Sequence, residues 1–130
     1  ARLLKFGVDY EVKKLNYELA TLSKQVGASY VAGSVGPTGL MHVPYGTAQQ
    51  QEMVELFRPQ IEGLAEAGVD YIIIETMMDI REVRAAVLAA KEACALPVAV
   101  TLTVEANGRT LSGTSLPTAL CPRWESARWD

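Results

Sequence analysis

Glu75 is the residue whose type and position most clearly suggest chemistry. It follows Ile72 to Ile74, a run apolar enough for a strand that is buried on both faces. Parallel α/β proteins bind ligands at the carboxyl ends of such strands. Glu75 could therefore bind a cationic group or act as a general base, but a solvated or helix-capping strand-end glutamate fits its position equally well. Thr76 could hydrogen-bond a substrate, or it could simply hydrogen-bond polar groups of its own loop.

A second candidate site is the turn-rich segment Ser-Val-Gly-Pro-Thr-Gly at 34–39, which contains Ser34 and Gly36. Backbone N–H groups at a strand end can bind an anion such as a carboxylate or phosphate. The segment has neither the GxGxxG nor the GxxxxGK[ST] pattern, so a nucleotide site is weakly supported. A tight turn without a ligand is at least as good an interpretation.

The other residues capable of chemistry give weaker signals. His42, the single histidine, stands in an irregular segment, and we expect it at the surface rather than in catalysis. Arg109 could bind a substrate carboxylate, although a structural role is more common. Cys94, near a predicted helix end, is expected to be a small buried residue. Cys94 and Cys121 form no metal-ligand pattern, which favours a reduced, cytoplasmic protein.

The apolar periodicity predicts the elements that must position these residues. Helices are expected at 10–26, 47–67 and 79–94, and strands at 29–35, 69–74 and 97–104. Thr47 is the expected N-cap of the second helix, and Pro59 should kink or break it. Asp79 and Glu82 have the spacing of a capping box at the start of the third helix.

Alternating helices and strands predict parallel pairing by right-handed crossovers. The fold class is therefore α/β, either an open doubly wound sheet or part of a (β/α)8 barrel. Both folds bring together the segments 34–39, 75–79 and the one after 104. The 130 residues suffice for one domain, and a net charge of −3 without a Lys/Arg cluster argues against a nucleic-acid partner. No apolar run is long enough for a membrane span.

Four motifs together resemble the homocysteine-binding methyltransferase family. They are Val-Ala-Gly-Ser-Val-Gly-Pro-Thr-Gly at 31–39, Glu-Ala-Gly-Val-Asp at 66–70, Ile-Glu-Thr at 74–76 with Asp79, and Gly-Arg-Thr-Leu-Ser-Gly-Thr at 108–114. Residues 1 to about 120 follow the family pattern in order. The likeness is greatest to the homocysteine domain of the family's cobalamin-dependent methionine synthases.

The resemblance implies a partial (β/α)8 TIM barrel, with roughly strands three to five in residues 1–120. It also implies homocysteine as substrate, a catalytic zinc, and a methyl group from methylcobalamin or methyltetrahydrofolate. By position, Glu75 matches the glutamate that holds the homocysteine ammonium. Thr76, Ser34 and Gly36 are expected to line the same amino-acid pocket.

The sequence departs from the family pattern at its ends. The family's three zinc cysteines are expected beyond Asp130, and neither Cys94 nor Cys121 matches them. The chain also lacks an initiator Met, so we expect a fragment, and we expect it to be inactive alone because the zinc ligands are missing. Two alternatives stay open: a small α/β module that binds an amino acid or phosphate, and an unrelated barrel enzyme with Glu75 as general base.

Residues 121–130 contain two Trp and two Arg where the family has a helix end and an apolar strand. Back-translation with two nucleotides dropped can read Pro-Ala-Leu-Gly-Val-Gly-Ala-Val-Gly, close to what the family has there. We therefore predict that the tail is a frameshift product. A natural divergent terminus is the alternative.

Overall fold

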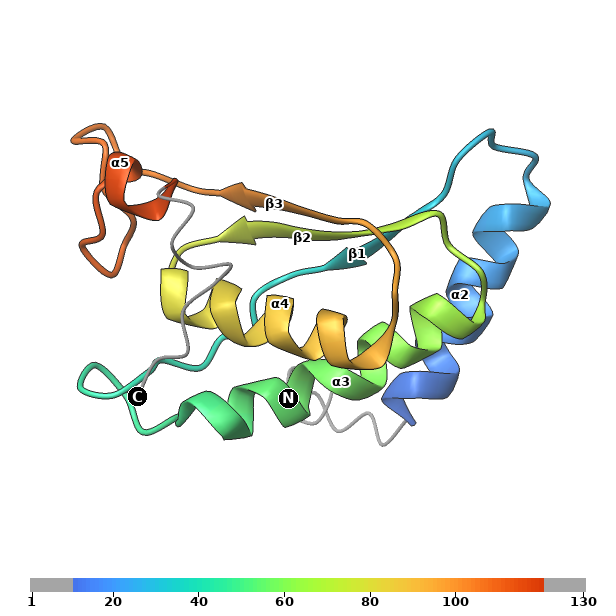
Figure 1. Ribbon diagram of the computed structural model, residues 1–130, viewed down its shortest axis with the longest axis horizontal. Coiled ribbons are helices and arrows are strands. Elements are labelled where there is room, and N and C mark those ends of the chain that lie inside the picture. Colours follow the sequence, from blue (N-terminus) through green and yellow to red (C-terminus); the bar gives the residue numbers. More distant parts are fainter. Residues whose placement is uncertain (1–10, 121–130) are drawn as a thin grey trace.

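A computed structural model of the chain describes residues 11–120. The expected frameshifted tail and Cys121 lie outside the described residues. The described part contains a sheet of three parallel strands in the order β1-β2-β3, as the alternation of elements predicts. The strands are β1 (Ala32–Val35), β2 (Tyr71–Met77) and β3 (Val98–Leu102). Their carboxyl ends therefore lie at one edge of the sheet (Figure 1).

Helices cover one face of this sheet (Figure 1). α3 (Gln50–Glu66) connects β1 to β2, α4 (Ile80–Ala93) connects β2 to β3, and the two helices pack against each other. α2 (Val12–Gln25) packs on α3, and the short α5 (Leu116–Ala119) follows β3. The fully buried core between sheet and helices includes Val35, Met53, Phe57, Ile61, Ile72, Ile74, Met77 and Val83.

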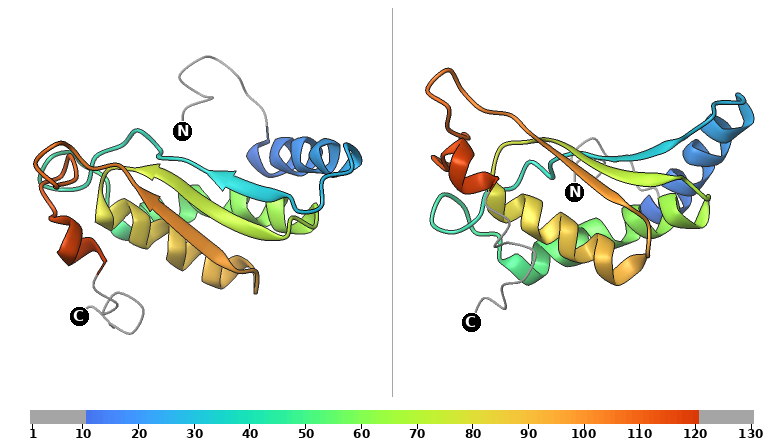
Figure 2. Two further views of the ribbon diagram at one scale, coloured as in Figure 1. Left: turned by 90° about the horizontal axis from the view of Figure 1, so that it is seen from above. Right: turned by 45° about the horizontal axis from the view of Figure 1, so that its top comes forward.

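The opposite face of the sheet is not covered by any described helix (Figure 2, left). Along β2, Ile72 and Ile74 are buried under the helices, whereas Tyr71, Ile73 and Glu75 are only half-buried. Strand side chains alternate between faces, so the half-buried residues belong to this open face. The three-stranded sheet agrees with part of a (β/α)8 barrel, but residues 11–120 do not close one.

Two glycines allow the layers to approach closely. A Cβ on Gly33 would lie 3.0 Å from Ile72 Cδ1 and 3.1 Å from Leu64 Cβ, so α3 could not pack as tightly on β1. A Cβ on Gly63 would lie 2.2 Å from the carbonyl oxygen of Lys13, at the contact between α2 and α3. Glycine is the residue that fits at both positions.

Several predicted boundaries are wrong. The second helix begins after Gln49 rather than at Thr47, and Gln49 N donates to Glu52 Oε2 at 3.3 Å. It continues through Pro59, so the proline does not break it. β1 starts at Ala32 instead of 29, and β2 extends past Glu75 to Met77 because a β-bulge keeps the last residues paired. Among residues 11–120, no helix has the length and apolar character needed to cross a bilayer.

Candidate functional site

Glu75 and Ser34 meet at the carboxyl-end edge of the sheet. Ser34 Oγ donates a hydrogen bond of 2.5 Å to Glu75 Oε1 across the β1–β2 pair. Both side chains are on the open face, with Glu75 half-buried and Ser34 exposed. Between residues 11 and 120 no Lys or Arg forms an ion pair with Glu75, and its Oε2 receives no hydrogen bond. Within residues 11–120, the site therefore contains a half-buried carboxylate with one oxygen oriented by Ser34 and one that accepts no hydrogen bond.

Gly36 begins the loop that follows β1. A Cβ built on Gly36 meets no atom within 4 Å, so the space beside it is open. The loop is fixed two residues later: Thr38 N and Thr38 Oγ1 donate to Glu82 Oε1 at 2.7 and 2.6 Å. Leu40 N donates to Thr38 Oγ1 at 3.1 Å. Glu82 is only 5% exposed, and it does not complete the capping box that its spacing with Asp79 predicts.

Asp79 is the N-cap of α4, as predicted, and accepts a hydrogen bond of 2.9 Å from Arg81 N. The Arg81 guanidinium binds the Asp79 carboxylate, donates to Val43 O at 2.6 Å, and lies over the Tyr45 ring at 5.8 Å. Burial alone raises the pKa of Asp79, but the hydrogen bonds from Arg81 outweigh it and hold that pKa below its ordinary value. The first turn of α4 thus holds the 36–48 loop at several points.

Thr76 follows Glu75 in an unusual conformation, with φ of 61°. Its side chain is exposed, and its backbone N–H donates to Thr101 Oγ1 of β3 at 3.2 Å. The 108–114 motif also reaches this edge, because Ser112 N and Oγ both lie 3.4 Å from Met78 O. The four predicted site residues therefore lie along one edge, although a direct side-chain contact joins only Glu75 and Ser34.

Glu82 and Thr101 also belong to this arrangement and were missed from the sequence as site residues, whereas Thr38 lies within the predicted 34–39 segment. Glu82 and Thr38 are 44 residues apart, so no local pattern pairs them. Thr101 lies within the third predicted strand, whereas we sought the site only after residue 104. Alternation along 98–102 is the one available signal, because it puts Thr101 on a different face from Val100.

The structure corrects the expectation for His42. It is 5% exposed rather than at the surface, in a bridge with Ala48, and its Nε2 has no hydrogen-bond partner in the described part of the chain. It lies close enough to Asp79 to contribute to the lowered pKa of that carboxyl group. Arg109 Nη1 donates to Gly113 O at 2.8 Å, a contact within its own loop. Cys94 is half-buried at the end of α4.

Residues 11–120 include no group of three His, Cys, Asp or Glu side chains that could hold a metal ion. Cys94 is the single cysteine in this part, and its Sγ lies 3.5 Å from Ala90 O within its own helix. The described residues therefore do not fit the three-cysteine zinc site that the family resemblance implies.

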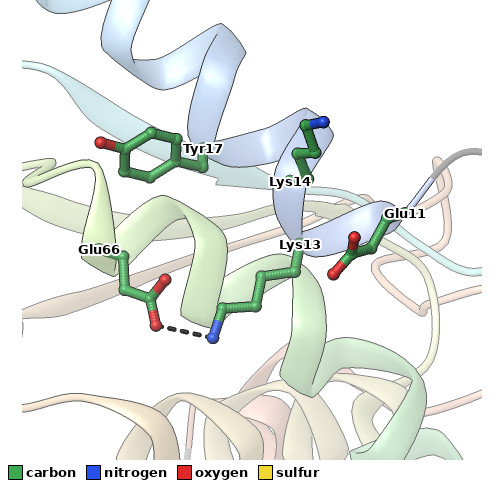
Figure 3. Close-up of a pocket in the computed structure, with 5 residues that line it drawn as sticks. All are labelled: Glu11, Lys13, Lys14, Tyr17 and Glu66. Atoms are coloured by element: carbon green, nitrogen blue, oxygen red, sulfur yellow. Dashed lines mark ion pairs between the residues drawn. The ribbon is translucent and has the colours of Figure 1, made fainter.

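A separate cavity of about 340 Å³ lies between α2 and α3, lined by Glu11, Lys13, Lys14, Tyr17 and Glu66 (Figure 3). Lys13 Nζ binds Glu66 Oε1 at 2.7 Å and Glu62 Oε2 at 3.4 Å, and these carboxylates raise the pKa of Lys13. Glu66 ends the helix that leads into β2, so the cavity is at the amino end of that strand. Glu75 lies toward the carboxyl end of the same strand, so the cavity is separate from the edge described above.

Comparison with known proteins connects the site to a family. Residues 1–126 match the family model of homocysteine S-methyltransferase. The methionine synthases of Mycobacterium leprae and Mycobacterium tuberculosis are each 31% identical to this chain over 96 residues, which is 70% of the chain but 8% of either enzyme.

The fold also matches a solved structure. The apo crystal structure of the homocysteine methyltransferase MmuM from Escherichia coli superposes with a TM-score of 0.68 at 24% identity. The match covers 80% of this chain and 42% of MmuM. With a family model that matches nearly its whole length, the chain belongs to the homocysteine S-methyltransferase family.

Proposed function

We propose that this chain forms the amino-acid-binding side of a homocysteine S-methyltransferase site, in which Glu75 binds the ammonium group of homocysteine. The observation that supports this most strongly is the state of Glu75. Its carboxylate is half-buried at the ligand-binding edge and has no cationic partner among residues 11–120. A partly desolvated carboxylate is stabilised by a positive charge, and an ammonium group supplies both the charge and N–H donors.

The neighbouring residues have supporting roles in this proposal. Ser34 donates to Oε1, which orients the carboxylate and leaves Oε2 for the ligand. Thr76 provides an exposed hydroxyl next to it, and the open space at Gly36 admits the amino-acid backbone of the substrate. Glu75 is then a binding residue and not an acid or base, because an ammonium that it binds needs no proton transfer there.

The complete enzyme, in this proposal, is a zinc-dependent cytoplasmic barrel enzyme that takes its methyl group from methylcobalamin or methyltetrahydrofolate. The likeness to methionine synthases supports this donor, and the two unclustered cysteines support the location. Zinc supplies the activation of the homocysteine thiol. Since the described residues lack its ligands, we propose that the 130-residue chain alone binds homocysteine but does not methylate it.

The experiment is a calorimetric titration of L-homocysteine into the 130-residue chain under reducing conditions. N-acetyl-L-homocysteine is the matched ligand, since it keeps the thiol and carboxylate but has no ammonium. The Glu75→Gln variant should bind L-homocysteine roughly tenfold to a hundredfold more weakly, as expected for one hydrogen bond to a charged group. Glu11→Gln, at an exposed glutamate before α2 that lines the separate cavity at the amino end of β2, is the control.

Three results would refute the proposal: no homocysteine binding by the chain, equal binding of the acetylated ligand, or equal binding by Glu75→Gln. Zinc titration separates the second part of the proposal from the first. Stoichiometric zinc binding, or methionine formation by this chain with either methyl donor, would contradict the view that it binds without catalysing.

A further inference from the structure

The β2–β3 pair contains a bulge at Glu75. Ile74 pairs with Val100 and Met77 pairs with Leu102, so Glu75 and Thr76 together oppose the single residue Thr101. Two residues against one is the defining feature of a β-bulge, which is rare between parallel strands and over-represented next to active sites. This bulge lies at the proposed ammonium-binding carboxylate.

The bulge changes which side chains face the open side of the sheet. With regular alternation, Thr76 would lie on the same face as Ile74, and Met77 would turn away from the core. Instead Met77 is fully buried with Ile74, while Glu75 is half-buried and Thr76 is exposed. The strand therefore presents two consecutive polar residues away from the helices without losing a core side chain.

The conformation of Thr76 makes this arrangement possible. Its φ of 61° lies in the left-handed region, which a β-branched residue rarely adopts, and it is the single non-glycine residue with positive φ between 11 and 120. Residues held in such conformations cluster at functional sites, where the surrounding structure must maintain them. The contact that does so here is between side chain and backbone: Thr76 N donates to Thr101 Oγ1 at 3.2 Å.

We propose that Thr101 is a positioning residue for homocysteine recognition: by accepting the Thr76 N–H, it holds the bulge that directs Glu75 toward the ligand ammonium. The inference rests on the proposed function of Glu75. Ser34 of β1 fixes the Glu75 carboxylate by a direct hydrogen bond to it. Thr101 of β3 acts on Glu75 indirectly, through the backbone N–H of the next residue, Thr76. Thr101 need not touch the substrate for this role.

The test is a double-mutant cycle on homocysteine affinity. Thr101→Val keeps the shape of the side chain and removes the acceptor, whereas Thr101→Ser keeps the acceptor. Loss of one hydrogen bond predicts about fivefold weaker binding for Thr101→Val and near wild-type binding for Thr101→Ser. If Thr101 acts through Glu75, Thr101→Val should have no further effect in the Glu75→Gln background, because coupled residues are not additive.

Thr103→Val is the matched control, since Thr103 is an exposed threonine two residues along the chain. Equal binding by Thr101→Val and the wild type would overturn the inference. So would the same loss in the Glu75→Gln background, because it would show a general structural effect.

A readout without ligand separates this inference from the proposed function. The ¹³C carboxyl resonance of Glu75 should move in Thr101→Val and stay in place in Thr103→Val. An unmoved resonance contradicts the positioning role whether or not homocysteine binds. If the resonance moves but the chain binds no homocysteine, Thr101 does position Glu75, and the proposal that Glu75 binds homocysteine is overturned.

Discussion

Replacement of Glu82 by alanine should loosen the loop after β1 and destabilise the whole chain. Glu82 is 5% exposed, and one carboxylate oxygen accepts both the backbone N–H and the hydroxyl of Thr38, at 2.7 and 2.6 Å. Alanine removes the acceptor of both bonds, which leaves the N–H of half-buried Thr38 without a partner and its hydroxyl, as a donor, with only the weak contact of 3.6 Å to Met53 Sδ. The effect should therefore exceed that of an ordinary surface substitution.

The magnitude follows from these two contacts. A hydrogen bond to a charged group contributes about 1.5–3 kcal/mol, and the two share one acceptor atom, so their sum overestimates the loss. We expect Glu82→Ala to lower the free energy of unfolding by about 3 kcal/mol. Glu82→Gln keeps an oxygen at the same place without the charge, and it should lose about 1 kcal/mol.

Urea unfolding followed by circular dichroism measures these differences, provided that the slope with denaturant stays constant. Glu105→Ala is the control for loss of a glutamate at an exposed position. Thr38→Val removes the hydroxyl from the other side of the contact, so its effect should not add to that of Glu82→Ala. A loss below about 1 kcal/mol for Glu82→Ala, or additive effects of the two variants, would refute this account of the loop.

Three further predictions concern the surrounding structure. Gly63→Ala should lower the free energy of unfolding by about 2 kcal/mol or more, because the new Cβ would lie 2.2 Å from Lys13 O. The loss should exceed that of Glu66→Ala, which removes the exposed ion pair with Lys13, and denaturant unfolding of both variants measures the difference. Because the folded pKa of Asp79 is lowered, its stabilisation is complete above the ordinary value of 3.8 and is lost as pH falls through the folded pKa. Asp79→Asn should therefore flatten the fall in stability below about pH 4, and an unchanged acid-unfolding curve would contradict this. Thr76→Gly should leave stability equal or higher, since relief of roughly 1–2 kcal/mol of left-handed strain offsets the backbone entropy of glycine; a loss above about 1 kcal/mol in thermal unfolding would show that Thr76 is unstrained.

The element order and the parallel sheet were predictable because the patterns that specify them are local. Ile72 to Ile74 indicate a buried strand without reference to the rest of the chain, and glycines at 27 and 68 end helices through their positive φ. The meeting of Glu75 and Ser34 also follows, because carboxyl ends of adjacent parallel strands share one edge. Strand boundaries were less accurate where pairing partners, rather than propensity, decide them.

The unpredicted features depend on contacts between distant segments. Asp79 and Glu82 have the sequence of a capping box. The Glu82 carboxylate nevertheless accepts hydrogen bonds from the N–H and the hydroxyl of Thr38, which comes from another loop. Threonine disfavours the left-handed conformation, so nothing in the Ile-Glu-Thr motif indicates the bulge at Thr76. His42 is buried and forms a bridge to Ala48, whereas its place in an irregular segment of the sequence suggests exposure.

Under the proposed function, one face of the sheet contributes stability and the other face recognises the ligand. Ile72, Ile74 and Met77 point into the helix layer and supply the buried apolar area that stabilises the fold. Glu75, on the other face, contributes little to that core, and its hydrogen bond to Ser34 is partly exposed to water. Substitutions that remove the polar contacts of the open face should therefore change homocysteine affinity far more than the free energy of unfolding. The bulge makes this separation possible, because it lets Met77 stay in the core while Glu75 and Thr76 just before it lie on the open face.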